Sequence, residues 1–210
     1  SSSAASDVYK RQIEPTTIAV QCCSRAELES EDTVMIIGSG ALGSSILRIV
    51  KLYNPKAIIV TDIDDAKLEE AKKNGATYTI NSLKEDVPAK AHELTEGYGP
   101  TVTIDAACVK GSLLTALQAT GNAGRVITMG FSVAPTEVNQ FVITSKELDV
   151  RGSRLQNRKF QDVIDLVNEG KVDLRGSISH TWNFEDAQAA FDFVDSRDPS
   201  YRKGVLTFKK

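Results

Sequence analysis

Apolar residues along the chain fall into short, uninterrupted runs, and the stretches between the runs alternate apolar and polar residues with a helical period. Runs of this length are typical of strands buried on both faces of a sheet. The predicted strands occupy 33–37, 57–60, 78–80, 101–105 and 124–130. From residue 14 onward, the pattern therefore predicts strands joined by helices.

The stretches between the runs have the spacing of amphipathic helices. After the first strand, one helical face would hold Leu42, Ile46, Ile49, Val50 and Tyr53. A second helix is predicted at 65–73 and ends near Gly75, and a third begins at a capping box formed by Ser82 and Glu85. With a further helix at 111–120, the alternation predicts an α/β fold, a doubly wound parallel sheet with helices on both faces.

Beyond Gly130 the alternation becomes less regular. A strand is predicted within 147–153, helices within 159–170 and 184–196, and a last strand at 203–208. No internal repeat or low-complexity linker separates these elements from the earlier ones.

Composition narrows the class of protein. The chain has 210 residues, 41% hydrophobic and 25% charged, which suits one globular domain with part of a second. The net charge is −3 and no basic patch stands out, so we expect no nucleic-acid partner. No apolar run approaches the roughly 18 residues of a membrane span, and we expect a cytoplasmic protein with no membrane contact. Residues 1–12 lack any periodicity, and we interpret them as a non-native leader.

The cysteine and histidine content predicts no metal site within the chain. The cysteines are Cys22, Cys23 and Cys108, with no C-x-x-C pair, and the histidines are His92 and His180. Neighbouring helical side chains point about 100° apart, so Cys22 and Cys23 are poorly placed to share one ion. We interpret them as buried small hydrophobic residues, His180 as packed or exposed, and His92 as lying on a solvated helix face.

Three glycines between the first strand and its helix form a G-x-G-x-x-G motif. Gly38 would make the tight turn, Gly40 would let a pyrophosphate approach the backbone, and Gly43 would let helix and strand pack closely. The amides at Ala41 and Leu42 would face the phosphates at the positive end of the helix dipole. A glycine motif alone is weak, but its position between a buried strand and a helix predicts a dinucleotide site.

A carboxylate at the end of the second strand supports this site. Asp62 stands 19 residues beyond Gly43, where dinucleotide-binding domains place an acidic residue for the ribose hydroxyls. A carboxylate repels a 2′-phosphate, so NAD is favoured over NADP. Asp64 either adds to this preference or caps the following helix.

A family resemblance adds to these residues. The segments "GSGALG", "IIVTDIDDAKLEEAKKNGAT", "TIDAAC", "GRVITMGF", "ELDVRGSR", "NFEDAQAAFDFVDS" and "KGVLTF" resemble the medium-chain, zinc-type alcohol and polyol dehydrogenases. The resemblance covers residues 13–210 and implies a Rossmann NAD-binding domain at 13–155. It implies that 156–210 is the C-terminal segment of an incomplete catalytic domain, which packs on the Rossmann domain and on an absent one. The family's zinc ligands lie in that absent N-terminal domain, where alone we expect zinc.

The resemblance also implies roles for single residues. Lys67 matches a basic residue that reaches the adenosine ribose in the family, although it could be a solvated helix charge. Ala107, Cys108 and Gly130 follow predicted strands, at the edge where ligands bind in open α/β sheets. Cys108 would be either a cofactor neighbour or a buried inert thiol. Glu14 lies near the metal in polyol-type members, but a helix cap explains it equally well.

The substrate side is less defined, and the catalytic residues stay unknown. The loop 151–157 resembles one that approaches the nicotinamide in relatives that oxidise polyols and sugar acids. Arg154 would there either pair with a substrate carboxylate or be a surface arginine. The resemblance implies hydride transfer from a zinc-bound secondary alcohol to NAD. The full-length enzyme would be a homo-oligomer, and the isolated chain would bind NAD without turnover.

Two other functions remain open. A stand-alone NAD-sensing module would use the same glycine loop and Asp62 without a catalytic domain. A zinc-independent reductase of the same superfamily would use NADPH on enones or quinones, which Asp62 disfavours. An apolar stripe also needs a partner that the resemblance places in the absent domain, and it consists of Phe184, Ala187, Phe191 and Val194.

Overall fold

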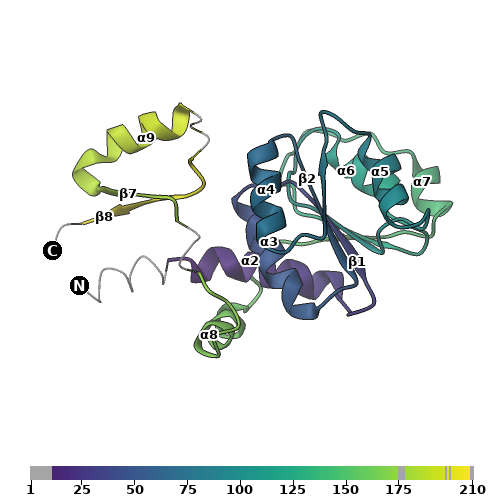
Figure 1. The fold of residues 1–210 in the computed structure, drawn as a ribbon, viewed down its shortest axis with the longest axis horizontal. Coiled ribbons are helices and arrows are strands. Elements are labelled where there is room, and N and C mark those ends of the chain that lie inside the picture. The colour runs from purple at the N-terminus through teal and green to yellow at the C-terminus, as the bar shows by residue number, and fades with distance from the viewer. Residues whose placement is uncertain (1–10, 175–177, 197, 199, 209–210) are drawn as a thin grey trace.

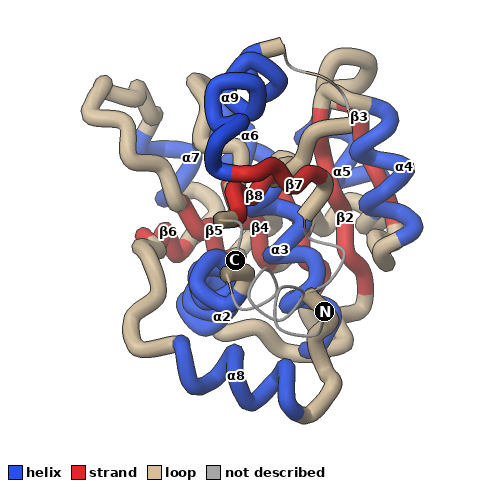
Figure 2. Tube along the Cα trace, turned by 90° about the vertical axis from the view of Figure 1, so that its left-hand side faces the viewer, coloured by secondary structure: helices blue, strands red, loops and turns tan. Residues whose placement is uncertain are grey.

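A six-stranded parallel sheet forms the centre of the molecule (Figures 1 and 2). The computed structural model describes residues 11–174, 178–196, 198 and 200–208. The strands are β1 (Thr33–Ile37), β2 (Ala57–Asp62), β3 (Tyr78–Asn81), β4 (Val102–Asp105), β5 (Arg125–Thr128) and β6 (Asp149–Gly152). Their order is β3-β2-β1-β4-β5-β6, and every neighbouring pair is parallel. The predicted doubly wound sheet is confirmed.

The strand order reverses between β1 and β4, which lie side by side although two strands separate them in sequence. At this reversal the following loops run to opposite faces of the sheet and leave a crevice at the carboxyl ends of the strands. The strands β1, β2 and β4 are buried on both faces of the sheet, and this is why their sequences are uninterrupted apolar runs.

Helices cover both faces, as Figure 1 shows, with α2, α3 and α4 on one side and α5, α6 and α7 on the other. Their bounds are α2 (Ile13–Ala26), α3 (Ala41–Val50), α4 (Asp65–Lys73), α5 (Val87–Leu94), α6 (Ser112–Ala119), α7 (Gln140–Thr144) and α8 (Phe160–Asn168). A 3-10 turn, η1 (Lys51–Tyr53), extends α3. Each face holds its own apolar core, because the strands present side chains to both sides.

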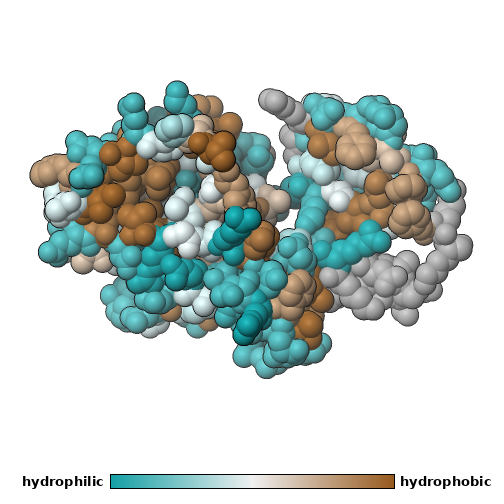
Figure 3. All heavy atoms as spheres, turned by 180° about the vertical axis from the view of Figure 1, so that it is seen from behind, coloured by the Kyte–Doolittle hydropathy of each residue, from teal (hydrophilic) through white to brown (hydrophobic). Residues whose placement is uncertain are grey.

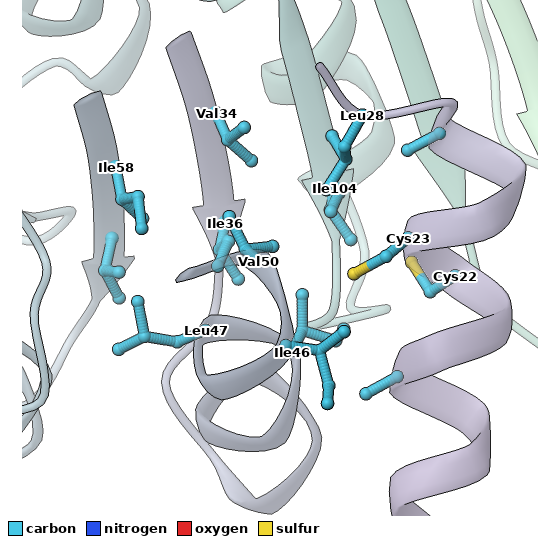
Figure 4. Close-up of a cluster of buried hydrophobic side chains, with 14 of the residues drawn as sticks. Cys22, Cys23, Leu28, Val34, Ile36, Ile46, Leu47, Val50, Ile58 and Ile104 are labelled. Atoms are coloured by element: carbon cyan, nitrogen blue, oxygen red, sulfur yellow. The ribbon is translucent and has the colours of Figure 1, made fainter. Parts of the chain in front are cut away.

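The two adjacent cysteines of α2 belong to the first of these cores. Cys22 and Cys23 are fully buried, and Figure 4 shows them directed from α2 toward Ile104 and Ile46. Burial raises the pKa of Cys22 to about 12 and the pKa of Cys23 well above its ordinary value. The interpretation of both as small hydrophobic residues is confirmed.

The start of α5 differs from the prediction. The Asp86 side chain accepts a hydrogen bond of 2.8 Å from the amide of Ala89, and Pro88 occupies the first turn. The capping box of Ser82 and Glu85 is therefore wrong, because Ser82 belongs to the turn after β3 and donates its amide to the Asp62 carbonyl. Pro88 fits the first turn because its missing N–H would have had no helical partner there.

The sequence pattern missed a short helix and a strand, whereas it predicted the strand within 147–153, which is β6, without saying which strand it pairs with. Helix α7 is only five residues long, β6 joins the main sheet beside β5, and β7 (His180–Asn183) was missed altogether. β7 carries a single strongly apolar side chain, Trp182, which gives no strand period to detect.

A small C-terminal lobe stands beside the main sheet (Figure 1). It consists of β7, β8 (Gly204–Thr207), η3 (Phe184–Asp186) and α9 (Ala187–Asp195), with β7 and β8 paired in parallel. His180 packs against Trp182 and Phe193, with ring centroids 5.4 and 4.6 Å away, so it is a packed histidine as one of the two interpretations held. The lobe therefore has an aromatic core of its own.

Residues outside the predicted Rossmann range of 13–155 also lie buried against this part of the molecule. Val163 of α8, Val172 and Leu174 belong to the core that α2 and α3 build on one face of the sheet. These three residues belong to the segment after residue 155 that was expected to pack on the Rossmann domain. Gln12, within the segment set aside as a leader, is buried and accepts the amide of Thr16. Among the described residues, no helix is long and apolar enough to cross a membrane.

Candidate functional site

The glycine loop after β1 leaves no room for a side chain at two of its three glycines. Gly38 has a φ of +93°, and a Cβ added there would lie 3.0 Å from the Cβ of Ala107. A Cβ added at Gly43 would lie 1.8 Å from the Gly38 carbonyl oxygen, whereas one added at Gly40 would meet nothing within 4 Å. Gly38 and Gly43 thus satisfy the protein's own packing, and Gly40 leaves open space where a ligand can approach the backbone.

The carboxylate of Asp62 is held in place at the end of β2. Its Oδ2 accepts a hydrogen bond of 2.7 Å from the Ser39 amide, and its Oδ1 accepts one of 3.1 Å from the Asp64 amide. Asp62 thereby joins the glycine loop to the second strand. Asp64 caps α4, with its own carboxylate accepting from the Ala66 amide at 2.8 Å, which favours the structural interpretation of that residue.

A cleft of about 670 Å³ opens where the strand order reverses. Its walls come from the ends of β1 and β2, the loops that follow β3 and β4, and the first turns of α5 and α6. The predicted residues that line it are Gly38, Gly40, Asp62, Lys67 and Ala107. Its volume suits a small molecule of cofactor size, and it combines apolar walls with a few polar groups.

Two exposed apolar side chains line this cleft and were not singled out from the sequence. Ile63 is 61% exposed and Val109 is 66% exposed. Ile63 directly follows Asp62 and Val109 directly follows Cys108, so each is a single apolar residue within a loop, and periodicity alone could not separate it from an ordinary loop residue. Such exposure inside a cleft indicates surface that a flat apolar ligand would cover.

A second, smaller pocket of about 250 Å³ lies at the other side of the glycine loop. The predicted residues Ala41 and Leu42 line it, together with Arg202 and Lys203 of the C-terminal lobe. Burial lowers the pKa of Lys203, and the nearby Glu14 carboxylate opposes that effect. No local pattern in the sequence indicates these two cations, because they lie about 160 residues from the helix that they approach.

Cys108 and Gly130 lie together beyond the cleft wall rather than in it. A Cβ added at Gly130 would lie 3.7 Å from the Cβ of Cys108, and neither residue is among those that line the cleft. Cys108 is exposed, so its interpretation as a buried thiol is wrong. Partial desolvation and the Asp105 carboxylate raise the pKa of Cys108, which is the wrong direction for a nucleophile.

The remaining candidate residues lie on the surface or at helix ends. The guanidinium of Arg154 lies over the ring of Phe131, 5.3 Å from its centroid, and both residues are exposed. Glu14 is exposed in the first turn of α2. His92 is only half-exposed, because its Nδ1 lies 3.0 Å from the Gly97 carbonyl, so its assignment to a solvated face is only partly right.

The described ranges hold no group of three or more histidine, cysteine, aspartate or glutamate side chains placed to bind a metal ion. Cys22 and Cys23 are buried in an apolar core, and Cys108 faces the surface. These residues do not fit a zinc centre, and no chemical step through zinc can be assigned to them.

A parallel sheet in this order, with a glycine loop and an acidic residue at its switch point, defines a Rossmann-type dinucleotide-binding domain. The chain belongs to the zinc-binding dehydrogenase family, whose model matches residues 41–169. The family resemblance drawn from the sequence is confirmed.

Individual relatives are similar over most of the chain. The starvation-sensing protein RspB of Escherichia coli K12 is 36% identical over 208 residues, 99% of this chain and 61% of the relative, so most of segment 1–12 lies within the aligned part. Sorbitol dehydrogenase of Gallus gallus is 27% identical over 86% of this chain and 51% of its own. The chain thus spans about half to three-fifths of the length of these relatives.

Solved structures agree with this assignment. A short chain alcohol dehydrogenase (rspB) of Escherichia coli CFT073, complexed with NADH, superposes with a TM-score of 0.85 at 37% identity. The match covers 93% of this chain and 58% of that one. L-idonate 5-dehydrogenase of Escherichia coli K-12 shares the fold alone, with a TM-score of 0.83 at 23% identity, over 96% of this chain and 57% of its own.

Proposed function

We propose that the chain is the NAD-binding portion of a zinc-dependent alcohol, polyol or sugar-acid dehydrogenase, which oxidises a secondary alcohol to a ketone. The observation that carries this proposal is the Asp62 carboxylate, held by the Ser39 amide at the rim of a cleft that the glycine loop also lines. Family membership supports the reaction class, and the relative that was solved with NADH supports the cofactor.

The cleft residues suit the parts of NAD in order. Asp62 would accept hydrogen bonds from the adenosine ribose hydroxyls, and Lys67, on the same wall, would reach the same sugar. Ile63 and Val109 would cover the two faces of the adenine ring, which would explain why both are exposed in its absence. The diphosphate would cross the open space at Gly40.

The second pocket suits the other end of the cofactor. Ala41 and Leu42 stand at the N-terminus of α3, and Arg202 and Lys203 face the same pocket from the C-terminal lobe. Arg202 is paired with Glu70, which lines the same pocket, so the Lys203 ammonium and the helix N-terminus are the groups that favour a negatively charged ligand group. When bound, NAD would supply the hydride acceptor of the reaction.

The charge at the ribose end favours NAD over NADP. The Asp62 carboxylate would repel a 2′-phosphate, and the nearby Glu85 and Asp86 also line the cleft. Both Asp62 oxygens accept hydrogen bonds from backbone amides, which hold the carboxylate in place at this position. The stand-alone NAD-sensing alternative shares all of these contacts.

In the proposed full-length enzyme, zinc and most of the substrate would be bound outside this chain. Relatives named sorbitol dehydrogenase and erythritol/L-threitol dehydrogenase support a polyol substrate, and Arg154 is a candidate to pair with a sugar-acid carboxylate. The full-length enzyme would form a homo-oligomer. Because the chain spans about half the length of such relatives, we expect negligible turnover from it alone.

The test is isothermal titration of the chain with NADH and, separately, with NADPH. The proposal expects NADH to bind with a clearly lower Kd than NADPH. Tighter binding of NADPH would instead support the zinc-independent reductase, and no binding of either nucleotide would reject a dinucleotide site. Reduction of NAD by the chain in the presence of a polyol would contradict the expected lack of turnover.

A further inference from the structure

A buried carboxylate lies directly beneath the wall of the main cleft. Asp105 is the last residue of β4, is only 2% exposed, and does not itself line the cleft. It stands in register with Ile37 of β1 and Thr128 of β5, so it occupies the middle of the sheet at the ligand-binding edge. A carboxylate in such a place is costly unless hydrogen bonds satisfy it.

Its two oxygens are bonded to the middle and to the end of the loop between β4 and α6. Oδ1 accepts a hydrogen bond of 3.0 Å from the Cys108 amide, and Oδ2 lies 2.7 Å from the Ser112 hydroxyl, which donates to it and also lies 2.8 Å from the Val109 carbonyl. Cys108 has a φ of +54°, a left-handed conformation that needs such support. One side chain therefore holds the middle of this loop and the first residue of the helix that follows it.

The same loop is one wall of the cleft. Ala106, Ala107, Val109, Lys110 and Gly111 all line it, and so does Ser112 at the start of α6, whereas Asp105 does not. Ala107 also lies against the glycine loop, since a Cβ added at Gly38 would come within 3.0 Å of the Ala107 nitrogen. A shift of the loop would therefore move both the apolar wall at Val109 and the support of the phosphate-binding turn.

We infer that Asp105, acting through the Cys108 amide and the Ser112 hydroxyl, is a positioning residue for the cofactor. It sets the width of the cleft without touching the ligand. This inference rests on the proposed function, because it concerns the same nucleotide cleft. It adds a residue that the glycine motif and Asp62 do not include.

The chain provides a matched control at the other end of the same two elements. Thr103 lies two residues before Asp105 on β4, is fully buried, and lies 2.7 Å from the hydroxyl of Thr120 at the end of α6. Like the pair of Asp105 and Ser112, this pair joins β4 to α6 through side chains. Neither threonine lines the cleft, so Thr103→Ala should lower stability without changing the wall.

The experiment measures NADH affinity by titration, and the emission maximum of bound NADH, for the whole chain and four variants. Asp105→Ala and Ser112→Ala should weaken NADH binding by about 3- to 10-fold and shift the emission toward that of free NADH. Asp105→Asn keeps an oxygen for the Cys108 amide and should recover most of the affinity. Thr103→Ala should bind as the parent does.

Hydrogen exchange of the free chain gives a readout that does not need the nucleotide. Amides of residues 106–111 should exchange faster in Ser112→Ala than in Thr103→Ala, and Ser112→Ala serves if Asp105→Ala does not fold. If the parent binds NADH and the folded Asp105 and Ser112 variants match Thr103→Ala in affinity, emission and exchange, the positioning role is wrong while the proposed function stands. If the parent does not bind NADH, both are overturned.

Discussion

Arg125 and Asp32 form an ion pair at the end of the sheet opposite the cleft, with 2.5 Å between Nη2 and Oδ1. The guanidinium also donates to the carbonyls of Ala26 and Glu27, and Thr101 donates its hydroxyl to the same Asp32 oxygen. This network joins the end of α2 to the starts of β4 and β5. These polar contacts therefore tie together the same elements that the apolar core packs on that side of the molecule.

Removal of one partner should be costly because the other would stay largely buried. Asp32→Ala should lower the free energy of unfolding by about 3 kcal/mol, measured by urea denaturation. Lys56→Ala is the control, because it breaks the exposed pair of Lys56 with Glu31 and should cost under about 1 kcal/mol. Equal losses in the two variants would mean that the Arg125 network contributes little.

Asp62→Ala should weaken NADH binding by about 10- to 100-fold, the cost of a lost charge-assisted hydrogen bond to the ribose. The same change should weaken NADPH binding less, or strengthen it, because a repelling charge is gone. Glu69→Ala, an exposed acidic residue on α4, controls for net charge. Fluorescence titration that finds unchanged NADH affinity in Asp62→Ala would remove this residue from the site.

Gly40→Ala and Gly43→Ala should separate binding from folding. At Gly40 an added methyl meets no protein atom, so the melting temperature should stay within about 2 °C of the parent, while NADH affinity falls by at least about 10-fold. At Gly43 the methyl would overlap the Gly38 carbonyl, so Gly43→Ala should lower the melting temperature itself. Thermal denaturation and titration of both variants make the comparison.

The buried thiols should make stability fall in alkali. The folded pKa of Cys22 is about 12 and that of Cys23 is raised as well, both above the ordinary value of 9.0. The unfolded chain therefore loses these protons first, so their contribution is complete below pH 9 and declines above it. At pH 10 each thiol should account for a loss of about 1.4 kcal/mol.

Urea unfolding at pH 7.5 and pH 10 measures this loss. The double variant Cys22→Ala, Cys23→Ala should show a smaller drop between the two pH values than the parent does. Cys108→Ala is the control, because Cys108 is exposed and its pKa is raised less by its surroundings. The same drop in all three proteins would assign the alkaline loss to other groups.

The C-terminal lobe should promote self-association of the chain. Phe184, Phe191 and Phe208 are all more than half exposed, and Figure 3 shows apolar surface on this lobe. Phe191→Ser should therefore shift the chain toward monomer in size-exclusion chromatography. Tyr98→Ser changes an exposed aromatic residue elsewhere and should not, so an equal effect of both would argue against the lobe as the contact.

The sequence predicted the glycine loop and the position of its acidic residue better than the C-terminal lobe, for physical reasons. A glycine at φ +93° and an aspartate at the end of a buried strand are local demands, so Gly38 and Asp62 can be recognised from the strands and the helix next to them in the sequence. The start of α5 was misplaced because Ser82 and Asp86 both suit a cap, and only the backbone path after β3 decides between them. Arg202 and Lys203 reach the second pocket through tertiary packing, which no local pattern records.

Among the residues that the structure describes, those that line the main cleft all fall between Ile37 and Gln118, a single continuous stretch of the chain. During synthesis this stretch leaves the ribosome as one piece, ahead of β5, β6 and the C-terminal lobe. The residues that would contact a ligand in the main cleft thus belong to one continuous segment of the sequence. For the described residues after Gln118, a substitution would act on the main cleft through the support that β5, β6 and the later helices give to its walls.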